Sequence, residues 1–144
     1  QDMYDAVTEE AKNSDIIIKA AAVADYTPLN VSDNKIKKKD GDMSIALKRT
    51  KDIIGTLGEH KKEGQFICGF SMETENIIAN SKDKLIKKNM DMIVANNVKV
   101  AGAGFGTDTN VVTIITGEDN IELPMMSKED VASKILDFIM AKCR

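Results

Sequence analysis

The residues that could do chemistry in this chain form a few short groups, and two of them lie close together. In the first group, the small residues 20–24 follow an apolar run and lead to Asp25 and Tyr26. The second group is the basic segment 35–39. A strand that opens onto a loop produces the first pattern, and ligands of an open α/β sheet bind at that edge. The lysines indicate that such a ligand is anionic.

A further group follows another apolar run, residues 65–70. Phe70 ends this run, and Glu73 and Thr74 come just after it. If the two runs are parallel strands, their carboxyl ends lie at the same rim of one sheet. Phe70 and Asp25 would then face the same site.

Lysines supply positive charge for a site at this rim. Lys84 and Lys88 lie about 40° apart around a helix expected at residues 75–90, and Lys35 belongs to the basic segment. A lysine acts as a point charge on a phosphate, and neutralising a triphosphate usually also requires a divalent cation. The residues alone therefore predict an anionic ligand, with a nucleotide as one candidate.

Each of these residues also has an ordinary structural explanation. Asp25 can be a turn former and Phe70 a core side chain. Lys84 and Lys88 can be a solvated helix face, and residues 35–39 an exposed flap that its charge keeps in solution. The pattern alone leaves these alternatives open.

Several other kinds of site lack the residues they need. His60 is the one histidine and lies near the end of a charged helix, so neither a Ser-His-Asp triad nor a zinc site can be assembled. Cys68 lies in an apolar run and is predicted to be buried, while Cys143 is in the tail. The glycines of residues 102–106 resemble a dinucleotide fingerprint. A strand is expected after them instead of a helix, which favours a plain loop and disfavours a hydride-transfer enzyme.

Composition sets further bounds. A net charge of −3 argues against nucleic-acid binding, which normally needs a basic domain. Apolar stretches are shorter than the roughly 20 residues that span a bilayer, so no membrane association is expected. Two cysteines far apart in sequence suit a reducing cytoplasm. The 144 residues fit one domain.

The elements that must position the candidate residues alternate along the chain. Helices are expected at residues 2–13, 51–61, 75–90 and 128–141, and strands at 15–20, 43–48, 65–70, 92–96, 111–116 and 121–123. Thr50 is the predicted N-cap of the second helix, and Ser127 with Asp130 forms a capping box for the last. Residues 25–34 are expected to be loop. This order predicts a Rossmann-like α/β sandwich of three layers, with a mostly parallel sheet and a C-terminal antiparallel hairpin.

Six motifs in this order resemble bacterial phosphopantothenoylcysteine synthetase, an enzyme of coenzyme A biosynthesis that is often fused to a flavin-dependent decarboxylase. They are residues 21–26, 35–38, 50–54, 69–74, 84–89 and 95–97. Each motif is weak alone, but the six occur in register across essentially the whole chain.

The resemblance implies a cytoplasmic ligase that works in two steps. The carboxylate of 4′-phosphopantothenate attacks the α-phosphate of CTP, in the presence of Mg²⁺, and gives an acyl-cytidylate and pyrophosphate. The amine of cysteine then displaces CMP and forms the amide. Such chemistry needs positioning and charge neutralisation more than a nucleophilic side chain. A homodimer is also implied, with the hairpin or the flap as the contact, and FMN is expected only if a decarboxylase domain precedes this chain.

The resemblance also implies which residues form the site. Lys35 corresponds to the lysine of a flap that closes over the triphosphate, and it is the predicted catalytic residue. The residues that correspond to CTP-binding positions are Ala21, Ala22, Asp25, Lys35, Lys51, Asp52, Ile53, Ile54, Phe70, Lys84 and Lys88. It assigns no metal ligands.

The sequence departs from the family pattern at three motifs and at its start. Residues 50–52 are Thr-Lys-Asp where the family usually has Asn-Pro-Asp, residues 95–97 are Ala-Asn-Asn where it has Ala-Asn-Asp, and residues 27–28 are Thr-Pro where it often has Arg-Pro. The family's first strand and glycine-rich loop would lie before Gln1. Residues 1–144 are therefore predicted to be one domain, the carboxyl-terminal portion of a synthetase. The alternative is a non-catalytic Rossmann-like module that binds a nucleotide or docks a partner.

Overall fold

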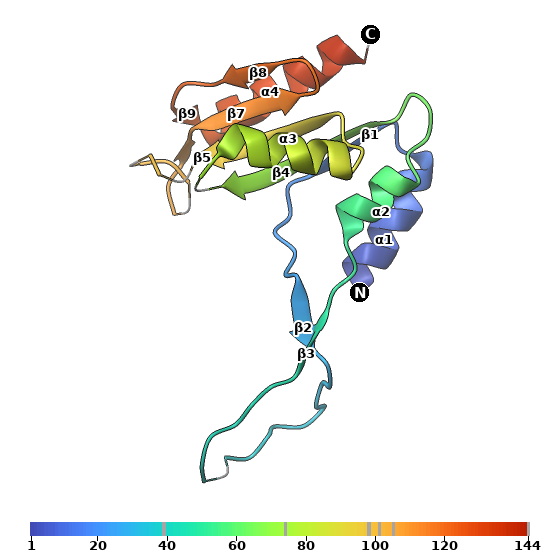
Figure 1. Ribbon diagram of the computed structural model, residues 1–144, viewed down its shortest axis with the longest axis vertical. Coiled ribbons are helices and arrows are strands. Elements are labelled where there is room, and N and C mark those ends of the chain that lie inside the picture. The colour runs from blue at the N-terminus through green and yellow to red at the C-terminus, as the bar shows by residue number, and fades with distance from the viewer. Residues whose placement is uncertain (39, 74, 98, 101, 105, 144) are drawn as a thin grey trace.

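The computed structural model describes residues 1–38, 40–73, 75–97, 99–100, 102–104 and 106–143. Predictions that fall on Lys39, Thr74, Ala101 and Phe105 lie outside the described residues. Within the described part, the chain forms a five-stranded sheet with helices on both faces, and a long arm that leaves this body (Figure 1).

The sheet has the strand order β1-β4-β5-β7-β8. Its strands are β1 (Ile16–Lys19), β4 (Phe66–Glu73), β5 (Met92–Asn97), β7 (Val112–Thr116) and β8 (Asn120–Glu122). The first three run parallel, and β7 and β8 are antiparallel to their neighbours. This arrangement confirms the predicted α/β class and the C-terminal hairpin.

Helices cover the two faces of the sheet unequally. They are α1 (Asp2–Glu10), η1 (Ala11–Asn13), α2 (Ile53–Glu59) and α3 (Ile77–Lys87) on one face, and α4 (Lys128–Lys142) on the other. Side chains of the central strands alternate between these layers. Ile67 and Ile93 pack toward α2 and α3, whereas Cys68 and Met92 pack toward α4. The three predicted layers are therefore present.

Two helix starts show how local side chains define element boundaries. Ser127 caps α4 as predicted, because its Oγ accepts a hydrogen bond from the Asp130 N–H at 3.0 Å and donates one to the Asp130 carboxylate at 2.6 Å. The prediction that Thr50 caps α2 was wrong. Asp52 is the N-cap, and its Oδ1 accepts a hydrogen bond from the Gly55 N–H at 3.0 Å.

The arm begins where β2 (Tyr26–Pro28) and β3 (Leu47–Arg49) pair antiparallel, and it points away from the sheet (Figure 1). Two predictions were wrong here. Residues 25–34, expected to be loop, contain β2. Residues 43–48, expected to be a half-buried strand, are exposed, and Met43 and Ile45 are 69% and 62% accessible. The arm leaves the body before these alternating apolar side chains can pack against it.

The first strand is less buried than the sequence predicts. β1 pairs with β4 and lies at the edge of the described sheet, and Ile16 and Ile18 are 36% and 39% exposed. Farther along, β6 (Thr109–Asn110) pairs with β9 (Met126–Ser127), so a strand follows the glycine loop as predicted. None of the described helices has the length and apolar character needed to cross a membrane.

Candidate functional site

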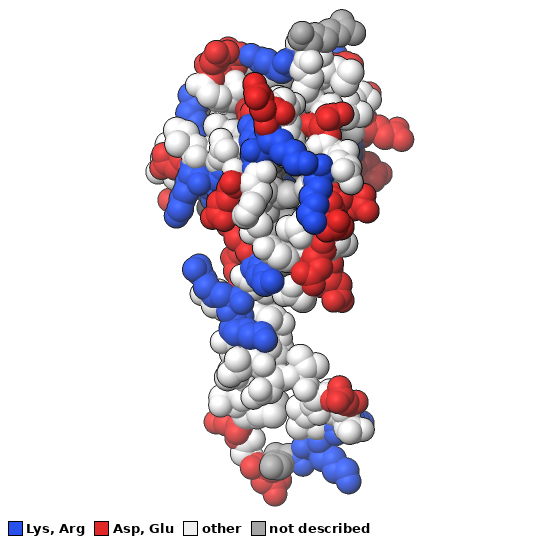
Figure 2. Space-filling model, turned by 90° about the vertical axis from the view of Figure 1, so that its right-hand side faces the viewer, with Lys and Arg blue, Asp and Glu red and all other residues white. Residues whose placement is uncertain are grey.

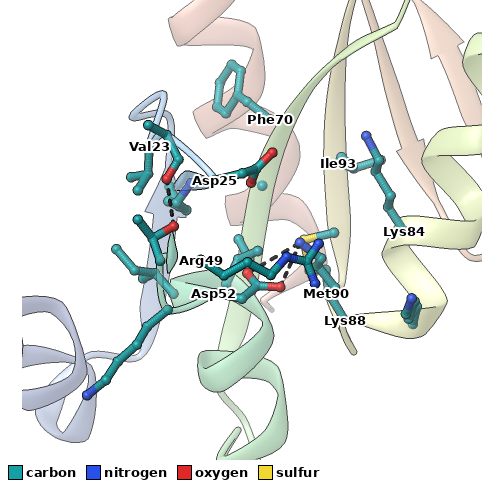
Figure 3. A pocket seen from close by; sticks show the side chains of 17 residues that line it. Val23, Asp25, Arg49, Asp52, Phe70, Lys84, Lys88, Met90 and Ile93 are labelled. Carbon is teal, nitrogen blue, oxygen red and sulfur yellow. Dashed lines mark hydrogen bonds and ion pairs between the residues drawn. The ribbon is translucent and has the colours of Figure 1, made fainter. Parts of the chain in front are cut away.

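A cavity of about 440 Å³ lies where the carboxyl end of β1 and the middle of β4 meet the start of α2 and the last turn of α3 (Figure 3). This is the rim at which the sequence predicts a ligand. The predicted site residues that line it are Asp25, Lys51, Asp52, Ile53, Ile54, Phe70, Lys84 and Lys88. Segments far apart in the sequence are thus brought to one opening.

Three of the predicted site residues are not among those that line this cavity. Ala21 and Ala22 lie just before its wall, which begins at Val23. Lys35 is exposed and belongs to the arm, which extends away from the body in Figure 1. The structure therefore brings eight of the eleven candidates together but leaves out Ala21, Ala22 and the predicted flap lysine.

Sequence reasoning missed Lys19 and Arg49 as residues of the wall, and it assigned no site role to Lys87, which lies within the motif 84–89. These three residues add three positive charges to the wall. Lys19 could have been identified from the sequence, because it is the polar residue that ends an apolar strand at the sheet's ligand-binding edge. Arg49 could not, since its position depends on the pairing of β3 with β2 at the base of the arm. Figure 2 shows lysine and arginine side chains gathered at this neck between arm and body.

Small and polar residues shape the cavity. A side chain on Gly69 of β4 would displace its neighbours, because a Cβ there would lie 2.7 Å from the Met90 sulfur and 3.1 Å from the Ile54 Cδ1. Thr50 fixes the opposite wall. Its hydroxyl donates a hydrogen bond to the Ala24 carbonyl at 2.6 Å, and its N–H donates to the Asp25 carbonyl at 2.9 Å. This use of the Thr50 hydroxyl explains why it does not cap α2.

An ion pair crosses the middle of the cavity. The Lys88 ammonium lies 3.0 Å from Oδ2 of Asp52, and Figure 3 draws the two side chains meeting between Asp25 on one side and Lys84 on the other. Burial alone would raise the pKa of the Asp52 carboxyl. The hydrogen bond from Gly55 and the charge of Lys88 outweigh burial, so this pKa is held below its usual value. Asp52 is therefore a carboxylate at neutral pH.

Contacts of both the main chain and the side chain hold Lys88 in place. α2 passes so close to the end of α3 that a Cβ on Gly58 would lie 1.9 Å from the Lys88 carbonyl oxygen. Next to it, Asn89 adopts a left-handed conformation with φ 48°, and its side-chain amide donates to the Gly58 carbonyl at 2.9 Å. The turn after α3 is thus held against α2 at Gly58, and the Lys88 side chain reaches the cap of the same helix.

The remaining reactive side chains lie elsewhere. Cys68 is fully buried as predicted, and burial raises the pKa of its thiol to about 12. His60 is exposed at the end of α2, and its Nδ1 lies 3.0 Å from the Thr56 carbonyl oxygen. Within the described residues, no three His, Cys, Asp or Glu side chains gather as a metal site. The cations of the cavity wall suit it to binding and orienting an anion.

Several relatives match nearly the whole chain. It is 54% identical over 141 residues to the coenzyme A biosynthesis bifunctional protein CoaBC of Bacillus subtilis (strain 168), and the match covers 97% of this chain and 34% of that protein. It is 46% identical over 140 residues to a cysteine/cysteine sulfinic acid decarboxylase from an unknown prokaryotic organism, with 96% of this chain and 39% of that protein covered. The chain thus spans little more than a third of the length of these relatives.

A solved structure and a family match agree with these relatives. A crystal structure of the C-terminal domain of the coenzyme A biosynthesis bifunctional protein CoaBC superposes with a TM-score of 0.76 at 40% identity, covering 96% of this chain and 60% of that one. Residues 1–143 match the DNA/pantothenate metabolism flavoprotein C-terminal domain. The resemblance predicted from the six motifs is confirmed, and the chain belongs to the family of the DNA/pantothenate metabolism flavoprotein C-terminal domain.

Proposed function

We propose that this chain belongs to a phosphopantothenate–cysteine ligase of coenzyme A biosynthesis and forms its CTP-binding part. The observation that carries the proposal is the cavity, where lysines from two elements surround an opening beside the parallel strands, at the carboxyl end of β1. Family membership and the bifunctional CoaBC relative support the choice of reaction.

The residues of the cavity fit a nucleotidyl transfer. The carboxylate of 4′-phosphopantothenate attacks the α-phosphate of CTP and releases pyrophosphate, and the cysteine amine then displaces CMP from the acyl-cytidylate. Lys84 and Lys88 neutralise the charge of the phosphates, which is the main requirement of phosphoryl chemistry. Asp25, at the opposite wall, accepts a hydrogen bond from a nucleotide hydroxyl or holds a cation. No covalent enzyme intermediate is needed.

A magnesium ion fits the oxygen donors of the wall. Mg²⁺ commonly binds one or two carboxylates together with the phosphates of its substrate, and it spreads the phosphate charge. Asp25 would hold it, because the Asp52 carboxylate is already engaged by Lys88 and Gly55. FMN has no assigned residue in this chain and belongs to the proposal only if a decarboxylase domain precedes it.

The arm is the proposed contact between two copies of the chain. Its exposed apolar side chains are Tyr26, Leu29, Val31, Ile36, Met43, Ile45 and Leu47, each between 50% and 81% accessible. Apolar surface of this extent marks an interaction site. A homodimer formed through the arm would cover it, and closure of the arm or approach of a second copy would bring Lys35 to a triphosphate.

The domain boundary and the location of the protein are also proposals. The half-exposed edge of β1 supports pairing with a further strand from the amino-terminal part of the synthetase domain. That part would complete the acyl-substrate site. We place the protein in the cytoplasm, which agrees with its two free cysteines.

Calorimetric titration of the native protein with CTP and Mg²⁺ tests the proposal. We expect saturable binding that Lys88→Met weakens, because the substitution removes a charge from the cavity. Lys134→Met is the matched control, since Lys134 is exposed on α4, on the opposite face of the sheet. Absence of heat with CTP and with ATP would contradict the assignment. Binding of CTP without any ligase activity in the native protein would favour the non-catalytic module instead.

A further inference from the structure

Lys19 is a cation of the cavity that the motif comparison does not assign. It is the last residue of β1, it is half-buried, and it lines the cavity. Its ammonium group donates a hydrogen bond at 3.0 Å to the carbonyl of Ala21, two residues along the chain. Lys19 therefore contacts the loop of small residues that leads into the cavity wall.

The charges around Lys19 are only partly balanced. Burial and the neighbouring Lys88 both lower the pKa of the Lys19 ammonium, whereas Asp52 and Asp25 act in the opposite direction and do not restore it. Lys19 is thus near enough to Lys88 for their charges to repel each other. A half-buried cation beside another cation is stabilised when an anion enters between them.

Lys19 also has the donors that such an anion requires. An ammonium group carries three N–H donors. Within the described part of the chain, this group donates a hydrogen bond to the Ala21 carbonyl. Lys19 is the last residue of β1, and its ammonium group contacts the Ala21 carbonyl just beyond the strand, so the charge lies at the sheet edge where ligands bind.

We propose that Lys19 is a further binding residue for the polyphosphate group of the nucleotide. By holding the Ala21 carbonyl, it also positions the small-residue loop against the ligand. This inference rests on the proposed function and adds a residue to the same site. Lys19 supplies charge to the cavity from β1, in addition to the lysines at the end of α3.

Titrations of the native protein with CTP, inorganic tripolyphosphate and CMP test whether the charge of Lys19 acts on the phosphates. Lys19→Gln removes the charge but keeps an N–H donor for the Ala21 carbonyl, whereas Lys19→Met removes both. Loss of one charge contact worth about 1.4 kcal/mol corresponds to about tenfold in affinity. We expect both variants to bind CTP and tripolyphosphate about tenfold more weakly, with CMP affected much less, and Lys19→Arg to restore most of the affinity.

Lys134→Met serves as the control for removing a lysine charge far from the cavity. Unchanged CTP affinity in Lys19→Gln would overturn the inference and leave the proposed function intact. An equal loss for CMP and CTP would also overturn it, because Lys19 would then not act on the terminal phosphates. Wild-type protein that binds neither CTP nor tripolyphosphate would overturn both proposals. If Lys19→Met does not fold, the Gln and Arg variants make the same comparison.

Discussion

Replacement of Gly58 by alanine tests how the structure positions Lys88. The Cβ of the new side chain would lie 1.9 Å from the Lys88 carbonyl oxygen and 2.8 Å from the Lys88 carbonyl carbon. Both are backbone atoms, so neither can turn away as a flexible side chain would. α2 and the turn after α3 must therefore separate by about 1.5 Å before an ordinary van der Waals contact is reached.

The expected effect on stability follows from two opposing contributions. Overpacking of a buried site costs up to about 3 kcal/mol, whereas alanine is favoured over glycine within a helix by about 1 kcal/mol. We expect a net destabilisation of about 2 kcal/mol, or roughly 4–8 °C in Tm for a chain of this size. Displacement of Lys88 from Asp52 should also weaken CTP binding.

Thermal denaturation followed by circular dichroism, together with calorimetric titration of CTP, measures both effects on the native protein. Gly117→Ala is the matched control, because a Cβ at Gly117 meets no atom within 4 Å. It should change the free energy of unfolding by no more than about 0.5 kcal/mol. If Gly58→Ala were as stable as the wild type or more stable, the close packing of α2 against Lys88 would be refuted.

Three further predictions follow from other parts of the structure. Lys35→Ala in the native protein should abolish most turnover while the fold stays intact, and normal activity would rule out the proposed flap role. A thiol reagent at pH 8 should modify Cys143 rapidly and Cys68 only after unfolding, because burial raises the Cys68 pKa to about 12. For these two cysteines, we expect one thiol to react rapidly in the native state and both to react in denaturant. Asp52→Asn keeps an N-cap but loses the ion pair. In the wild type, the lowered pKa of Asp52 adds to the free energy of unfolding at pH values above the unfolded-state pKa, and this contribution is lost as the pH falls through the lowered pKa. The variant should lack this contribution. Because this side chain is 54% exposed, the change at pH 7 should be no more than about 1 kcal/mol by urea unfolding, and equal acid sensitivity of variant and wild type would contradict the ion pair's contribution.

The parts of the fold that depend on residues close together in the sequence could be predicted. The capping box at Ser127 and the spacing of Val131, Ile135 and Ile139 identify α4 and its buried face, because hydrogen bonds and packing there repeat within one or two turns. The wrong predictions concern residues whose partners are distant in sequence. Alternation in residues 43–48 is typical of a half-buried strand, yet the arm carries them away from the core.

The candidate site shows the same limit. Thr50 and Asp52 are both good helix caps, and the choice depends on the Ala24 carbonyl, which engages the Thr50 hydroxyl. Gly58 weakens a helix by sequence rules, and its contact with Lys88 comes from a turn on another element. Family motifs identified most of the cavity, but they did not identify Lys19.

The most direct test of the account follows the release of pyrophosphate and CMP by the native protein in the presence of Mg²⁺. We expect pyrophosphate release from CTP only when 4′-phosphopantothenate is present, and CMP release only after cysteine is added as well. Lys88→Met should reduce both releases, whereas Lys134→Met should leave them unchanged. Pyrophosphate release that does not depend on 4′-phosphopantothenate, or an active protein that is unaffected by loss of Lys88, would contradict the assignment of this cavity to an acyl-cytidylate-forming ligase.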